Sequence, residues 1–152
     1  MDTTKTSSQG TNRKANDMED VKINLKIKLS ALWAALMFLY IYADIFKLFM
    51  PGELEKMISG RQGPLTTTQG SLLTVSILMM IPAFMVFLSL ALKVKVNRWV
   101  NIILGVVYTL VNISNLIGEN WAFYIFYGVA EIALTFLIVG YAWKWRNPES
   151  QA

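Results

Sequence analysis

The sequence has 152 residues, of which 55% are hydrophobic and 16% are charged, and its formal net charge is +4. A chain of this length and composition is expected to form one compact domain, and it is too apolar for an ordinary soluble protein. Cysteine and histidine are both absent, which excludes disulfides, thiol nucleophiles, thiolate or imidazole metal sites and histidine acid–base catalysis.

The N-terminal region is polar. Residues 1–20 consist mainly of Thr, Ser, Asn, Gln and charged residues, so they cannot bury enough apolar surface to become ordered, and we predict a disordered tail. It is not a signal peptide, because no apolar core follows its first basic residues. Residues 21–28 alternate apolar residues with Lys and Asn. Since a lone strand would have no partner, we predict a basic juxtamembrane segment that faces anionic headgroups, with recruitment of a cytoplasmic partner as the alternative.

Four long apolar stretches follow, at residues 29–50, 70–92, 99–117 and 121–143. Each has about the 20 residues that a helix needs to cross roughly 30 Å of hydrocarbon. The predicted fold class is therefore all-α: a four-transmembrane-helix bundle, up-down-up-down, in residues 29–146, with a short tail at 147–152. The turn at Gly118 and Asn120 is so short that the last two helices must pack as antiparallel neighbours.

Helix breakers and capping residues mark the connections. Pro51 ends the first stretch, and residues 53–58 predict one or two amphipathic turns on the membrane surface. The hydroxyls of Thr66 to Thr68 can cap the second stretch, and Asn97 is expected to cap the third.

One proline lies inside a predicted membrane helix. Pro82 has no N–H, so it leaves the carbonyl of Leu78 without its usual donor and predicts a bend near mid-membrane. A tolerated structural bend is the preferred interpretation, and a hinge or an exposed ion site is the alternative.

Basic residues lie mainly on one side of the predicted bundle. If the termini are cytoplasmic, that side holds 11 of the 14 Lys and Arg residues, namely Lys5, Arg13, Lys14, Lys22, Lys26, Lys28, Lys93, Lys95, Arg98, Lys144 and Arg146. The opposite side keeps Lys56 and Arg61, with Lys47 just inside the helix end. The positive-inside rule therefore predicts that the N- and C-termini are both cytoplasmic. Charges at helix ends indicate the lipid bilayer, rather than nucleic acid, as the partner.

Polar and small residues recur at helical spacing inside three of the stretches. They are Trp33, Met37, Tyr40, Asp44 and Lys47 on the first; Asn101, Gly105, Tyr108, Asn112, Asn115 and Glu119 on the third; and Tyr124, Gly128, Glu131 and Thr135 on the fourth. Steps of three and four residues place each set on one helix face. Since an ionisable group facing lipid costs about 3 kcal/mol, we expect these faces to converge inside the bundle.

Counting along the helices brings several of these groups to one depth. Asp44, Asn112 and Asn115 share the outer half, Glu131 lies nearer the midplane, and Asp44 can pair with Lys47 on its own helix. The preferred interpretation is that such groups only bond helices together. The alternative is a polar cavity open to the outer face. The candidate binding residues are Tyr40, Asp44, Lys47, Tyr108, Asn112, Asn115 and Glu131.

The runs LSALWAALMFLYIYADIF, MPGELE, TQGSLL, IPAFMVFLSL, VNRWVNIILGVVYTLVNISNLIGE and EIALTFLIVGYAWKW resemble an uncharacterised, mainly bacterial family of small four-helix membrane proteins. The resemblance covers about residues 26–146 and implies a bacterial cytoplasmic membrane. It transfers no substrate, reaction or functional residue. The general plan is also similar to that of DoxX-like membrane proteins, in helix number and size alone.

Two classes of function stay open. The favoured one is non-enzymatic: a subunit, or a binding protein or proton-coupled carrier for a small molecule or lipid, acting as a homo-oligomer because four thin helices enclose little room. The other is a membrane enzyme that uses Asp44 or Glu131 as acid or base on a lipid-like substrate. No arrangement of nucleophile and base supports the enzyme. We expect no cofactor and no metal.

Overall fold

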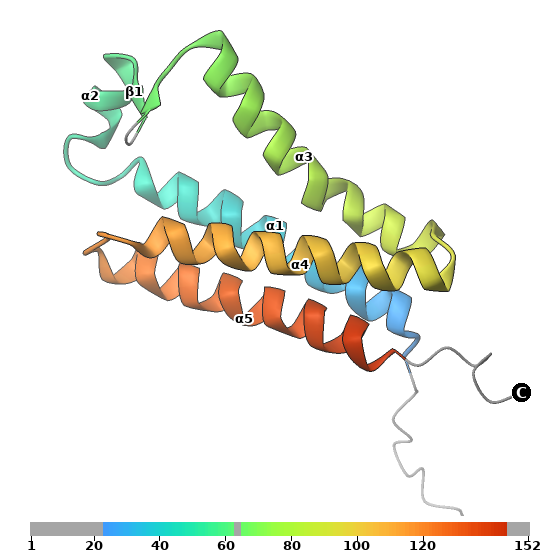
Figure 1. The fold of residues 1–152 in the computed structure, drawn as a ribbon. Helices are drawn as coiled ribbons and strands as arrows, with labels where there is room; N and C mark the ends of the chain where they lie inside the picture. Colours follow the sequence, from blue (N-terminus) through green and yellow to red (C-terminus); the bar gives the residue numbers. More distant parts are fainter. Residues whose placement is uncertain (1–22, 63–64, 146–152) are drawn as a thin grey trace, which may run out of the picture.

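The computed structural model describes residues 23–62 and 65–145, so the predictions for the tails at 1–20 and 147–152 lie outside the described residues. Its elements, shown in Figure 1, are α1 (Leu25–Lys47), α2 (Glu53–Ile58), β1 (Arg61–Gln62), β2 (Leu65–Thr66), α3 (Gln69–Ala91), α4 (Val94–Leu116) and α5 (Ala122–Lys144). Within the described part, four helices of 23 residues are long and apolar enough to cross a membrane. The predicted all-α class with four such helices is confirmed.

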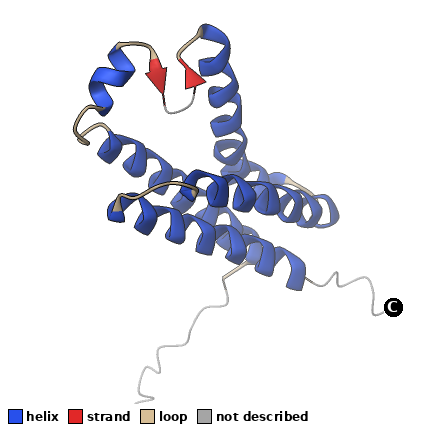
Figure 2. Ribbon diagram, turned by 60° about the vertical axis from the view of Figure 1, so that its left-hand side comes forward, coloured by secondary structure: helices blue, strands red, loops and turns tan. Residues whose placement is uncertain are grey.

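The long helices run alternately up and down. α1 packs against both α3 and α5, and α4 packs mainly against α5. α3 is inclined to the other three: it lies close to them where it joins α4, and diverges toward the end of the bundle that carries α2 (Figures 1 and 2). We call this end the α2 end. Burial follows the inclination, because residues 72–77 are all exposed whereas Pro82, Met85 and Ser89 are buried.

Side-chain caps define where α1 and α3 begin. α1 begins at Leu25, earlier than predicted, because the Asn24 carboxamide oxygen accepts from the backbone N–H of Lys26 at 3.0 Å. The ammonium of Lys26 donates to the Leu92 carbonyl at 2.7 Å, which holds the α3 C-terminus against α1. Thr68 caps α3 in a capping box with Ser71, as the sequence predicts.

α4 begins at Val94 rather than near residue 99, and the cap predicted at Asn97 is wrong. Lys95 is exposed, and the Arg98 guanidinium donates to the Trp143 carbonyl at 3.3 Å, so the first turn can be helical although it is basic. Asn97 is instead fully buried, and its Nδ2 donates to the Ser89 carbonyl at 2.6 Å.

Small residues let α4 and α5 approach closely, and the prediction that they are antiparallel neighbours is confirmed. A Cβ atom on Gly105 would lie 2.6 Å from Val139 Cγ2, and one on Gly128 would overlap the Leu116 side chain. Close packing of small residues is the kind of contact that stabilises helix pairs in hydrocarbon, where there is no hydrophobic drive to associate.

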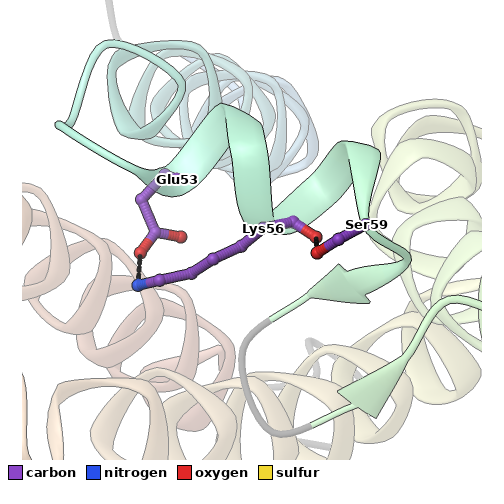
Figure 3. Close-up of polar contacts among 3 residues, drawn as sticks. All are labelled: Glu53, Lys56 and Ser59. Carbon is purple, nitrogen blue, oxygen red and sulfur yellow. Dashed lines mark hydrogen bonds and ion pairs between the residues drawn. The ribbon is translucent and has the colours of Figure 1, made fainter.

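The connection between α1 and α3 contains the predicted amphipathic turns. In α2, Lys56 donates to the Glu53 carboxylate at 2.6 Å, and the Ser59 hydroxyl donates to the Lys56 carbonyl (Figure 3). The hydrogen bond from Lys56 lowers the pKa of Glu53 below its ordinary value. β1 and β2 form an antiparallel ribbon that leads into α3.

Candidate functional site

A buried amide network joins α1, α3 and α4 in the half of the bundle away from α2. It consists of Trp33, Ser89, Asn97 and Asn101, all fully buried. The Trp33 indole N–H donates to Asn101 Oδ1 at 2.7 Å, and Asn101 Nδ2 donates to Asn97 Oδ1 at 2.6 Å. Because its strong donors all have acceptors, this network needs no ligand and bonds the helices together.

Tyr108 supplies the donor that Pro82 removes. Its hydroxyl donates to the Leu78 carbonyl, the acceptor that the sequence predicts to be without a backbone partner. The Tyr108 side chain is 1% exposed, and its ring meets the Trp33 ring edge-on at 5.8 Å. Tyr108 therefore serves the fold, although the sequence marks it as a binding candidate. The bend predicted at Pro82 stays a prediction.

A polar cavity of about 40 Å³ lies between the helices in the half that carries α2. It is lined by Tyr40, Ala43, Asp44, Met79, Val111, Asn112, Asn115, Tyr124 and Glu131. This volume admits one to about three waters or one small polar group. Most of the predicted binding residues thus meet here. The sequence places Tyr124 on a polar helix face but does not identify it as a binding residue. Ala43, Met79 and Val111 are apolar, so no feature of the sequence distinguishes them as cavity residues.

One side chain in the polar cavity has an unsatisfied donor. Asn112 is fully buried, and its Oδ1 accepts from the Tyr40 hydroxyl at 2.8 Å. Its Nδ2 is buried and has no partner within the described residues. If the side-chain amide of Asn112 were turned by 180°, its Nδ2 would face the Tyr40 hydroxyl and its Oδ1 would be the atom without a partner. A buried unsatisfied amide group costs about 1–3 kcal/mol, so a polar partner at this atom would stabilise the fold.

The two carboxyl groups of the polar cavity are not paired either. Glu131 is 6% exposed, and the described part of the chain gives its carboxyl neither a hydrogen bond nor an ion pair. Asp44 lines the same cavity but is exposed, contrary to the expectation that its face turns inward. Residues 72–77, in the first half of α3, are exposed at the same end of the bundle, where α3 diverges from α1 (Figure 1).

The described residues do not contain the close ion pair that Asp44 and Lys47 could form on α1, although the two side chains interact electrostatically. Among residues 23–62 and 65–145, the ion pair present is that of Lys56 with Glu53. The Lys47 ammonium lies 4.7 Å from the centroid of the Tyr124 ring instead. The face of an aromatic ring attracts a cation within about 6 Å of its centroid, and Tyr124 on α5 provides such a ring.

The family model described as a family of unknown function, DUF6326, matches residues 18–152. The chain belongs to the DUF6326 family. No curated protein and no solved structure matches it. The family match spans every helix of this DUF6326 protein and assigns it no reaction.

A second hollow of this DUF6326 protein is larger and apolar. It has about 320 Å³ and is lined by Phe46, Phe49, Met50, Trp121, Phe123 and Tyr127, where α1 ends and α5 begins. Aromatic side chains are common near the ends of membrane-spanning helices, so this lining does not by itself indicate a specific ligand. Within the described residues, no group of three or more acidic side chains could hold a metal ion. The chemistry that the polar cavity offers is hydrogen bonding and charge.

Proposed function

We propose that this protein is a multi-pass membrane protein that binds the polar part of a small molecule or lipid in the polar cavity, without catalysing a reaction. The observation that carries the proposal is the unpartnered Nδ2 of buried Asn112, which shares its cavity with the unpaired carboxyls of Asp44 and Glu131. A donor and two acceptors that face one small space form a site for a polar ligand.

The buried amide network provides an internal comparison. Its polar groups are as deeply buried as Asn112, yet the strong donors of Trp33, Asn97 and Asn101 all reach acceptors between 2.6 and 2.9 Å. Within this network, polar residues that bond helices together therefore find their partners, whereas Arg98 Nε, on another part of α4, is buried without one among the described residues. The polar cavity departs from that pattern, which supports a binding role over a purely structural one.

The distribution of charge supports an orientation for the site. Lys28, Lys93, Lys95, Arg98 and Lys144 all lie at the end of the bundle opposite α2. By the positive-inside rule this end faces the cytoplasm, so both termini are cytoplasmic and the polar cavity lies in the outer half of the cell membrane.

A carrier that acts as a homo-oligomer is the second candidate. It is favoured by residues 72–77 at the start of α3, which are all exposed. A second copy could bury this segment and enclose the polar cavity.

Mass spectrometry of retained small molecules tests the binding role. The parent, Asp44→Asn, Glu131→Gln and the control Glu55→Gln are purified in mild detergent, and circular dichroism verifies that each is helical. Glu55 is an exposed carboxylate on α2, outside the cavity. We expect the parent and Glu55→Gln to retain the same molecule and the two cavity variants to lose it. If no molecule is retained, or if folded cavity variants retain it as the parent does, the proposal is wrong.

A further inference from the structure

We propose that the ligand is an amphiphile with a primary ammonium head, of the 2-aminoethyl phosphate type, drawn from the surrounding lipid. The ammonium enters the polar cavity between Asp44 and Glu131, a neighbouring oxygen accepts from Asn112 Nδ2, and the apolar chains lie in the bilayer beside the first half of α3. This inference rests on the proposed function and names its ligand.

The charge of the polar cavity favours a cation. Asp44 on α1 and Glu131 on α5 face it from two helices, and neither has an ion pair within the described residues. The charge of Lys47 acts on Asp44 across the solvent-exposed end of α1, while its ammonium lies 4.7 Å from the centroid of the Tyr124 ring. An ion in a medium of low dielectric needs opposite charge and hydrogen bonds together, and an ammonium group with three donors matches carboxylate and amide oxygens.

The size of the polar cavity selects among cations. A space of about 40 Å³ holds a primary ammonium group, which is close to a water molecule in size. A trimethylammonium group adds three methyl groups, so it is much larger than a water molecule and exceeds this space. The site should therefore discriminate an aminoethyl head from a choline head.

Asn112 adds a requirement that a simple amine does not meet. Its Nδ2 is a donor, so it needs an oxygen on the ligand. An ammonium alone would pair with the carboxyls and leave this donor unsatisfied. In a 2-aminoethyl phosphate head, oxygen atoms follow two carbons after the nitrogen, so one ligand supplies both the cation and the acceptor.

Two residues of the cavity wall are exposed, which favours entry of the ligand's headgroup into the polar cavity from the surrounding lipid. Asp44 and Asn115 line the polar cavity and are exposed, and residues 72–77 of α3 are exposed at the same end of the bundle. α3 diverges from α1 on that side in both views (Figures 1 and 2). A headgroup can reach the carboxyls laterally, while its chains stay among lipids.

Native mass spectrometry with defined lipids tests this assignment. The probes are phosphatidylethanolamine, phosphatidylcholine and phosphatidylglycerol with identical short chains, together with soluble phosphoethanolamine. For the parent and Glu55→Gln, we expect phosphatidylethanolamine to bind about tenfold more tightly than the other three, which corresponds to about 1.4 kcal/mol. Asp44→Asn and Glu131→Gln should abolish that preference.

Several outcomes would overturn the inference. Equal binding of phosphatidylcholine would exclude selection of a primary ammonium, and equal binding of soluble phosphoethanolamine would exclude a lipid source. The comparison among probes uses the parent alone, so it decides the question even if a cavity variant does not fold. A retained molecule without an amine, lost in the cavity variants, would leave the proposed function intact and refute this ligand class.

Discussion

The hydrogen bond from Tyr108 to the Leu78 carbonyl can be tested by a double-mutant cycle with Pro82. Tyr108→Phe removes the hydroxyl and leaves the Leu78 carbonyl without a donor, because Pro82 has no N–H to offer. Pro82→Ala restores a backbone N–H four residues after Leu78. In that background the carbonyl has a donor on its own helix, so the hydroxyl of Tyr108 should matter much less.

The expected loss of stability in Tyr108→Phe follows from the burial of the hydrogen bond between Tyr108 and the Leu78 carbonyl. Tyr108 is 1% exposed, so water does not replace the lost donor. We expect Tyr108→Phe to lower the free energy of unfolding by about 1–2 kcal/mol, between the usual value for a hydrogen bond in a membrane protein and that for an unsatisfied buried carbonyl. In the Pro82→Ala background the loss should fall below about 0.5 kcal/mol, which gives a coupling energy of about 1 kcal/mol.

Steric trapping of the unfolded state in bicelles measures these free energies. Tyr42→Phe is the matched control, because Tyr42 is exposed and its loss of a hydroxyl should change stability very little. Equal losses for Tyr108→Phe with and without Pro82 would refute the assignment of this hydrogen bond as the replacement donor.

Three further predictions use other parts of the fold. Gly105→Ala should lower the free energy of unfolding by about 1–3 kcal/mol, because the added methyl group overpacks the contact with Val139. Gly140→Ala is the control: it has open space around its Cβ position and should leave the free energy of unfolding equal or higher. Thermal unfolding in detergent compares the two variants. Asn101→Leu should cost about 2 kcal/mol in the same assay, because the indole N–H that donates to it loses its acceptor. Lys56→Gln should raise the pKa of Glu53 toward its ordinary value, as followed by NMR titration of the carboxyl carbon. Since the pKa of Glu53 is lowered in the fold, the stabilisation exists above the ordinary pKa and disappears as the pH falls through the lowered one, so parent and variant should converge in acid.

The sequence predicts those features that depend on residues near one another along the chain. Apolar stretches of membrane-spanning length give the four helices, Thr68 gives a cap, and Pro82 identifies a carbonyl that needs an outside donor. The short turn at Gly118 fixes α4 and α5 as neighbours. Each of these follows from local geometry, and each is found in the structure.

Features that depend on the packing of whole helices could not be predicted in the same way. Asp44 is exposed, and α3 is inclined to α1, neither of which follows from the residues of α1 alone. Lys47 meets the ring of Tyr124, and Asn97 meets the carbonyl of Ser89, across helix contacts that spacing along one helix does not reveal. The unsatisfied donor of Asn112 likewise becomes evident only when its neighbours are placed.

The central claim is that polar side chains form a cavity that opens at the outer half of the bundle, and single-cysteine labelling tests it most directly. The chain has no cysteine, so Asp44→Cys and Ile113→Cys each introduce one thiol, three residues before the ends of α1 and α4 respectively. Asp44 lines the polar cavity, and Ile113 is exposed but lies outside it. A membrane-impermeant thiosulfonate added outside intact cells should modify the thiol at position 44 much faster than the one at position 113. Equal rates at the two positions, or reaction at position 44 only from the cytoplasmic side, would contradict the claim.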